Sequence, residues 1–201
     1  MMKSATALNK LVDQLSGQRN SGKSAGAPVD DWNPPFCGDL DMEIRRDGTW
    51  MYLGTPIGRP ALVKLFSSVL RKDEDGKTYL VTPVEKVGIR VEDAPFVIVR
   101  LDRLEIEGVS LLKLLTNVGE EILVGPDHPL RFEVEAETMG VKPYVHVRGR
   151  LDALFSRACM HELINLGEHV DVDGVSVFAV QSAGQSYPIM DSAALAEAVA
   201  Q

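Results

Sequence analysis

The chain has 201 residues, of which 45% are hydrophobic and 25% charged. This ordinary globular composition excludes collagen, coiled-coil and wholly disordered architectures, and the length allows one or two domains. The formal net charge is −8, but it is uneven: residues 1–100 carry 14 Lys/Arg and 13 Asp/Glu, whereas residues 101–201 carry 7 and 16. Nonspecific nucleic-acid binding needs a basic surface, so an anionic ligand is expected only at a local arginine cluster.

No stretch approaches the ~20 apolar residues of a membrane helix, and residues 1–6 lead into no signal-peptide apolar region. We therefore expect a cytoplasmic protein with no membrane partner. Cys37 and Cys159 stand far apart, which predicts buried, reduced thiols, with a redox-sensing thiol as the alternative.

Residues 1–31 are expected to form a short helix and a flexible linker. Leu8, Leu11, Val12 and Leu15 have helical spacing, and residues 17–28 have the Gly/Ser-rich composition of a linker. The globular body is expected to begin near Trp32.

Residues 32–107 predict a first α+β unit. Its strands are expected where apolar and polar residues alternate and where Asp-Gly pairs favour tight turns. A helix is expected to begin at Pro60, with an apolar stripe at Leu62, Leu65, Phe66 and Val69. The expected strands and turns are Leu40–Ile44, Asp47-Gly48, Thr49–Leu53, Asp75-Gly76, Tyr79–Val81, Val87–Val91 and Phe96–Leu101.

Residues 108–201 predict a second α+β unit of similar order. Strands are expected over residues 132–137 and 144–147, and a hairpin with Asp173-Gly174 over residues 170–180. Between them, a helix is expected with Leu151, Leu154, Phe155 and Ala158 on one side.

The two units also share residues at a constant offset of 89, which favours an internal duplication. The matching pairs are Arg59 and Arg148, Leu62 and Leu151, Leu65 and Leu154, Phe66 and Phe155, and Ser67 and Ser156. Chance similarity is the alternative.

Gly17, Gly22, Lys23 and Ser24 match the P-loop pattern letter for letter. A P-loop needs a strand before it and a helix directly after it, and this segment has neither signal. We therefore expect no nucleotide triphosphate site there. The histidines and cysteines lack metal-ligand spacing, and no catalytic residue, metal or cofactor is assigned.

Two strands carry carboxylates on one face: Asp39, Asp41 and Glu43, and Glu133, Glu135 and Glu137. Such rows could bind a hard cation or divide acid and base roles, as in a hydrolase or phosphotransferase. A solvated outer sheet face explains them equally and is the simpler interpretation.

Arg59 and Arg148 are each expected just before a helix, where the helix dipole disfavours a cation. A bound anion would explain them, with Arg150 adding charge and with Trp50 and Tyr52 stacking on a ring. The alternative is that each arginine pairs with the acidic strand of its own unit and clamps the fold.

Thr82 and Glu85 are further candidates, because Thr-Pro-Val-Glu follows a strand, where loops present polar groups to ligands. A turn built around Pro83 is the simpler explanation of this segment.

Several segments together resemble the proteobacterial domain-of-unknown-function family 1285, over roughly Trp32 to Ile189. They are Trp32–Pro35, Gly38–Ile44, Asp47–Tyr52, Gly54–Arg59, Leu80–Glu85, Val91–Phe96 and Thr116–Glu120. The resemblance implies two β-rich units from a duplication, the second superficially like a pleckstrin-homology fold. It also implies a site for a nucleotide-like or nucleic-acid-based ligand at the interface between the units, and a role in bacterial signalling.

The sequence thus favours a non-catalytic ligand-binding module, whose ligand-binding candidates are Arg59, Arg148, Arg150, Trp50, Tyr52, Thr82 and Glu85. A protein–protein interaction module is the alternative, because sheet edges accept partner strands. An enzyme that uses the carboxylate faces is a third hypothesis.

Overall fold

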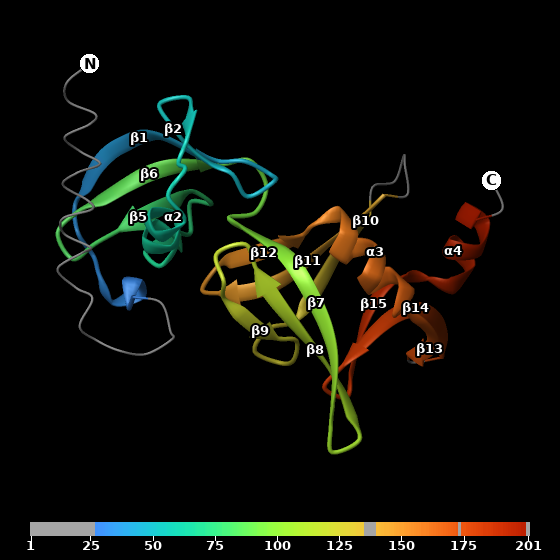
Figure 1. Ribbon diagram of the computed structural model, residues 1–201. Helices are drawn as coiled ribbons and strands as arrows, with labels where there is room; N and C mark the ends of the chain where they lie inside the picture. Colours follow the sequence, from blue (N-terminus) through green and yellow to red (C-terminus); the bar gives the residue numbers. More distant parts are fainter. Residues whose placement is uncertain (1–26, 135–139, 173, 200–201) are drawn as a thin grey trace. The chain divides into compact units, whose positions relative to one another are not determined.

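The computed structural model describes residues 27–134, 140–172 and 174–199 (Figure 1). The expected N-terminal helix, most of the linker and the P-loop-like pattern lie outside these residues. So do Glu135 and Glu137 of the second carboxylate row. Within the described residues, no helix is both long and apolar enough to cross a membrane.

The chain divides into two compact units, and the division falls between Pro95 and Phe96. Gly149–Leu151 group with the first unit, and the other residues after Pro95 form the second. The division lies about a dozen residues before the boundary expected at residue 107. Strand β7 (Phe96–Ile106) explains the difference, because it pairs with β8 and β12 of the second unit.

The first unit contains a six-stranded sheet in the order β3-β2-β1-β6-β5-β4. Its central strands β1 and β6 are parallel, and each outer neighbour pairs antiparallel. The Asp47-Gly48 and Asp75-Gly76 hairpins are confirmed. The strands are β1 (Phe36–Ile44), β2 (Trp50–Tyr52), β3 (Thr55–Pro56), β4 (Leu70–Lys72), β5 (Thr78–Val81) and β6 (Lys86–Val91).

Helix α2 (Pro60–Ser67) begins as expected, with Pro60 in its first turn, but ends before Val69. Phe66 of this helix stacks on Trp50 of β2, with ring centroids 6.2 Å apart. Both rings are almost completely buried, together with Met42 and Ile44 of β1. This apolar contact explains why the helix lies beside the sheet in Figure 1.

The first unit begins before Trp32, earlier than expected. A short 3-10 helix, η1 (Val29–Asp31), contributes the buried side chain of Val29. The backbone carbonyls of Val29 and Trp32 both accept hydrogen bonds from Arg71 of β4. The entry segment is therefore part of the fold and not linker.

The second unit contains a six-stranded sheet in the order β10-β11-β12-β7-β8-β9, with β12 and β7 parallel at its centre. Strands β8 and β9 had no counterpart among the predicted strands. The remaining strands are β8 (Val109–Thr116), β9 (Glu121–Leu123), β10 (Leu130–Val134), β11 (Val141–Arg148) and β12 (Leu151–Phe155).

The two sheets have the same topology, and each strand of the first sheet corresponds to the strand of the second sheet whose number is higher by six. Strand β1 therefore matches β7, and β6 matches β12. The offset of 89 residues pairs different elements: it places Leu62–Phe66 of helix α2 against Leu151–Phe155, which form strand β12. The residue alignment and the helix predicted over Leu151–Ala158 are both wrong.

A helix does follow β12, but it begins later than expected. Helix α3 (Arg157–Asn165) is capped by the Ser156 side chain, which accepts a hydrogen bond from the Cys159 backbone N–H. Cys159 is buried as predicted, and burial raises the pKa of its thiol. Cys37 is exposed, so the prediction that it is buried is wrong.

A three-stranded sheet, β13-β14-β15, completes the second unit, followed by helix α4 (Ser192–Val199). Its strands are β13 (Glu168–Val172), β14 (Val175–Ser182) and β15 (Gln185–Asp191), so the expected hairpin over residues 170–180 is confirmed. The buried Ser182 hydroxyl joins this sheet to the larger one. It donates to the Val124 carbonyl and accepts from the Leu112 N–H, at 2.8 and 3.0 Å.

Three two-residue hairpin turns place a residue other than glycine in the left-handed region. These residues are Leu53, Glu107 and Ala183, with φ of 49°, 53° and 53°, and each precedes a glycine that also has positive φ. Positive φ at both positions is the pattern of a type I′ turn, whose twist matches the flanking strands. A side chain with a Cβ adopts this region at a cost, and asparagine adopts it more easily.

Replacing Leu53 by asparagine is therefore expected to stabilise the protein by about 1 kcal/mol. Leu53 is exposed, so little packing is lost. Thermal unfolding followed by circular dichroism measures the change. Leu53→Ala is the control, because alanine also removes the leucine side chain but lacks the short polar side chain that helps asparagine adopt positive φ. An Asn variant no more stable than the Ala variant would contradict the prediction.

Gly167→Ala is expected to destabilise the protein by about 1–3 kcal/mol, because the added Cβ overpacks a filled site. That Cβ would lie 2.3 Å from Cζ of Phe178. Gly125→Ala is the matched control, since its Cβ would meet Ala183 at an ordinary 3.8 Å. Equal melting temperatures for the two variants would contradict the expected clash.

Candidate functional site

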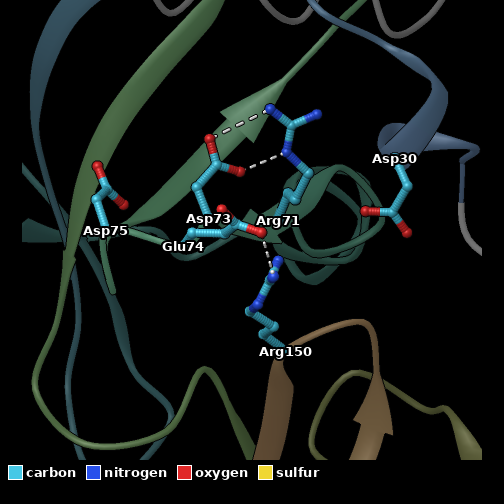
Figure 2. A pocket seen from close by; sticks show the side chains of 6 residues that line it. All are labelled: Asp30, Arg71, Asp73, Glu74, Asp75 and Arg150. Carbon is cyan, nitrogen blue, oxygen red and sulfur yellow. Dashed lines mark hydrogen bonds and ion pairs between the residues drawn. The ribbon is translucent and has the colours of Figure 1, made fainter.

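The first unit contains a hollow of about 640 Å³ lined only by charged residues (Figure 2). Four carboxylates and two guanidinium groups surround it. They come from η1, from β4 and the β4–β5 turn, and from the turn between β11 and β12, which groups with this unit. The residues are Asp30, Arg71, Asp73, Glu74, Asp75 and Arg150.

Arg71 is the structural centre of the hollow. Its Nε donates to Asp73 Oδ1 at 2.6 Å, and its Nη1 donates to the carbonyls of Val29 and Trp32, each at 2.7 Å. Figure 2 shows the guanidinium beside Asp73 and on the side facing η1. Since these bonds occupy both Nε and Nη1 of the guanidinium, Arg71 holds the wall together and is a poor candidate for binding a ligand.

Asp73 is shared between two cations. Besides Arg71, Lys86 of β6 donates to its Oδ2 from 2.9 Å. Burial raises the pKa of Asp73, but the hydrogen bonds and charges of Arg71 and Lys86 outweigh burial, so its pKa lies below the ordinary value. The carboxyl group is consequently ionised at neutral pH.

Asp75 forms a second fixed contact. The Tyr79 hydroxyl donates to it at 2.6 Å, and the Lys77 backbone N–H donates at 2.9 Å. These two bonds lower the pKa of Asp75. The same contact, with burial as a smaller cause, raises the pKa of Tyr79 to about 12. The Lys86 ammonium lies 4.5 Å from the centre of the Tyr79 ring, which links this contact to Asp73.

The remaining charges of the hollow are open to solvent. Arg150 donates to Glu74 at 2.9 Å, and the side chains are 56% and 87% exposed. Asp30 is also exposed. An exposed ion pair contributes ~0–1 kcal/mol, so a ligand can replace Glu74 as the partner of Arg150 at little cost.

Of the ligand candidates predicted from sequence, only Arg150 lines the hollow. Arg148 ends strand β11 and does not precede a helix; it donates to both oxygens of Glu120, at 3.1 and 2.8 Å. Arg148 therefore pairs within its own unit, as the alternative interpretation has it, but its partner Glu120 lies on a loop and not on the acidic strand expected for that role. Arg59 does precede helix α2, where it is exposed.

Trp50 and Tyr52 do not form a platform for a ring. Trp50 is 2% exposed and packs on Phe66 in the core, so the ligand-stacking role predicted for it is wrong. Tyr52 is half-buried, and burial, with the nearby charge of Asp41, raises the pKa of its hydroxyl. Strand β2 has only three residues, which is too few for the alternation of apolar and polar residues to show which side chains are buried.

Thr82 and Glu85 form a turn, as the simpler interpretation predicted. Thr82 is completely buried, and its Oγ1 accepts from the Glu85 N–H at 3.1 Å and donates to the Glu85 carbonyl at 3.2 Å. Glu85 is itself buried. Neither side chain is presented to a ligand.

The first carboxylate row is an exposed sheet face. Asp41 and Glu43 pair with Arg90 of the neighbouring strand, at 3.3 and 3.9 Å. In the second row, Glu133 pairs with Arg131. Across the described parts of the chain, no group of three or more His, Cys, Asp or Glu side chains is arranged to hold a metal ion.

The hollow was missed because its residues look like a turn. Arg71–Asp75 is a run of five charged residues before a glycine, which predicts a solvated hairpin and nothing more. The sequence signal that points to the hollow is Arg71, because a long cationic side chain within a strand needs hydrogen-bond acceptors. Those partners lie about 40 residues earlier in the chain, at Val29 and Trp32.

Together, the features define a two-unit, β-rich protein with a charged hollow in its first unit. Two family models match, described as the N-terminal domain (DUF1285) over residues 27–94 and the C-terminal domain (DUF1285) over residues 95–189, both of unknown function. The chain belongs to the DUF1285 family, as its sequence motifs indicated. The two matches meet one residue before the division between Pro95 and Phe96, and the second match also includes Gly149–Leu151.

Solved structures of the family are similar to the chain. A DUF1285 family protein from Silicibacter pomeroyi is 45% identical, with a TM-score of 0.78; the match covers 91% of this chain and 97% of that one. Another from Shewanella baltica is 31% identical, with a TM-score of 0.49, over 63% of this chain and 91% of that one. No curated protein matches the chain.

The Tyr79–Asp75 contact predicts how stability changes at alkaline pH. A pKa raised on folding, from 10.0 to about 12, favours the neutral hydroxyl in the folded state. The contribution of the Tyr79 hydroxyl to the free energy of unfolding is therefore present below pH 10 and is lost as the pH rises from 10 towards 12. The free energy of unfolding of the native protein should fall more steeply over that interval than that of Tyr79→Phe, measured by urea denaturation.

Asp75→Asn is the matched variant, because it keeps the tyrosine and removes the largest cause of its shift. Its pH profile should resemble that of Tyr79→Phe. Identical slopes for the native protein and Tyr79→Phe would contradict the assignment.

Proposed function

We propose that the protein is a non-catalytic ligand-binding module whose site is the charged hollow of the first unit. The observation that supports this most is the division of the lining into two parts. Arg71, Asp73 and Asp75 are fixed by internal hydrogen bonds, whereas Asp30, Glu74 and Arg150 are exposed. Ligand sites are usually largely pre-formed, and the fixed side chains supply such a pre-formed wall.

The charges favour a ligand that carries both hydrogen-bond donors and an anionic group. The lining residues and Lys86 together have four carboxylates and three cations, a net charge of −1. Carboxylates accept hydrogen bonds from amino groups at base edges, and a guanidinium binds phosphate in a bidentate manner. A nucleotide-like ligand satisfies both, with its phosphate on Arg150 and its base edge on Asp30 and Glu74.

A binding role is favoured over catalysis by the ionisation of the carboxylates. A general acid at neutral pH needs a raised pKa. The pKa values of Asp73 and Asp75 are instead lowered, because each accepts short hydrogen bonds. Asp73 and Asp75 therefore hold negative charge in place and have no proton to donate at neutral pH.

We also propose that the two units arose by duplication. The support is their common strand order, with a parallel pair at the centre of each sheet. The matched elements lie about 60 residues apart, as β1 and β7 do, and not 89. The pleckstrin-homology likeness of the second unit and a role in signalling remain predictions from the family resemblance.

The ligand proposal predicts a thermal shift with nucleotides. AMP, GMP, a cyclic dinucleotide and a short oligonucleotide are each added to the full chain, with guanosine and inorganic phosphate as separate arms. A ligand at one hundred times its Kd stabilises the native state by about 2.7 kcal/mol. We expect a shift with at least one nucleotide, and a smaller one with nucleoside or phosphate alone.

Glu74→Gln and Arg150→Gln should each weaken binding at least tenfold, measured by calorimetry. Arg157→Gln, an exposed arginine on α3, is the matched control and should bind normally. A shift that persists in both variants would place the ligand elsewhere. No shift with any probe would reject the nucleotide-like ligand.

A further inference from the structure

The fixed part of the charged hollow leaves few groups to meet a ligand. The three fixed side chains of its wall are already engaged by internal hydrogen bonds. The lining groups that remain are the exposed side chains of Asp30, Glu74 and Arg150. A carboxylate has only acceptor oxygens. A ligand bound here must therefore present hydrogen-bond donors to two carboxylates.

Asp30 is the more available of the two carboxylates. Glu74 pairs with Arg150, whereas Asp30 has no hydrogen-bond or ion-pair partner among the residues that the structure describes. Figure 2 shows Asp30 at the side of the hollow opposite Asp75. A Cβ on Gly149 would lie 4.0 Å from Asp30 Oδ2. Because Gly149 has no side chain, the turn that carries Arg150 approaches this carboxylate and leaves it exposed.

The bases differ in what they offer to a carboxylate. Guanine has two adjacent donors on its Watson–Crick edge, N1–H and the 2-amino group, and their spacing matches the two oxygens of one carboxylate. Adenine, cytosine and uracil each place a donor beside an acceptor on that edge. An acceptor that faces a carboxylate oxygen is repelled, and neither group gains a hydrogen bond. A carboxylate without a partner therefore favours guanine.

We propose that the hollow selects a guanine nucleotide and that Asp30 is the residue that recognises the base. This inference rests on the proposed function, because it names the base that the same site binds. The Asp30 carboxylate accepts hydrogen bonds from N1–H and from one hydrogen of the 2-amino group. Glu74, once the phosphate has replaced it on Arg150, accepts from the other hydrogen. The 2-amino group is thus the main determinant of specificity.

Calorimetric titration of the full chain with GMP, AMP, IMP and XMP tests the selection. IMP lacks the 2-amino group, and XMP carries an oxygen in its place. We expect GMP to bind at least tenfold more tightly than each of the other three, because a site built to accept from a donor rejects a ligand that lacks it. Equal affinities for GMP and AMP, or for GMP and IMP, would overturn the proposal.

Asp30→Asn replaces one acceptor oxygen by a donor and should reverse the preference. The amide fits XMP, because its oxygen accepts from N1–H and its amino group donates to the 2-oxygen. The variant should bind GMP at least tenfold more weakly than the native protein and XMP at least tenfold more tightly. A variant that is only damaged cannot gain affinity, so loss of GMP binding without a gain for XMP would overturn the role of Asp30.

Asp31→Asn is the matched control. Asp31 is the next residue of η1 and is also exposed, but it does not line the hollow. The variant makes the same change of charge and should bind GMP and XMP as the native protein does. An equal change of preference in Asp31→Asn and Asp30→Asn would show an effect of net charge and would overturn recognition by Asp30.

A failure of guanine selection differs from a failure of the proposed function. If none of the four nucleotides binds, both are rejected. If GMP and AMP bind equally and Arg150→Gln weakens both, the hollow remains the ligand site and only the selection of guanine by Asp30 is wrong.

Discussion

Each sheet depends on one pair of parallel strands at its centre. A short turn cannot join parallel neighbours, so the chain must leave the first strand of the pair and return by a long connection. In both units the chain runs from the first central strand through two antiparallel strands to one edge of the sheet. It then crosses to the opposite edge and returns through two strands to the second central strand. In the first unit the crossover contains α2; in the second it is the short segment between β9 and β10. The two units therefore share a strand order while differing in their helices.

This arrangement also determines where chemistry can occur. The central strands are enclosed by their neighbours, so exposed polar groups collect where a hairpin folds back. The charged hollow lies at the β4–β5 hairpin, where Arg71 and Asp73 form a fixed polar wall.

Local patterns predicted much of the fold and little of the site. Asp-Gly pairs located three hairpins, because that dipeptide tolerates positive φ. The hairpins at Leu53, Glu107 and Ala183 carry no such signal. Strand β12 was mistaken for a helix because Leu151, Ala153, Leu154 and Phe155 are all buried, which removes the two-residue alternation. The sequence does not show the partner of Arg148, because Glu120 lies 28 residues away on a loop, and only the folded sheet brings the two side chains together.

The contact of Arg71 with Val29 and Trp32 determines where the first unit has to begin. The first sheet alone does not satisfy this guanidinium, because two of its acceptors come from the segment that precedes β1. A unit that began at β1 would lose both of these acceptors and would leave Arg71 with Asp73 as its partner. The entry segment therefore belongs to the folded core of the first unit, although it precedes the first strand of the sheet.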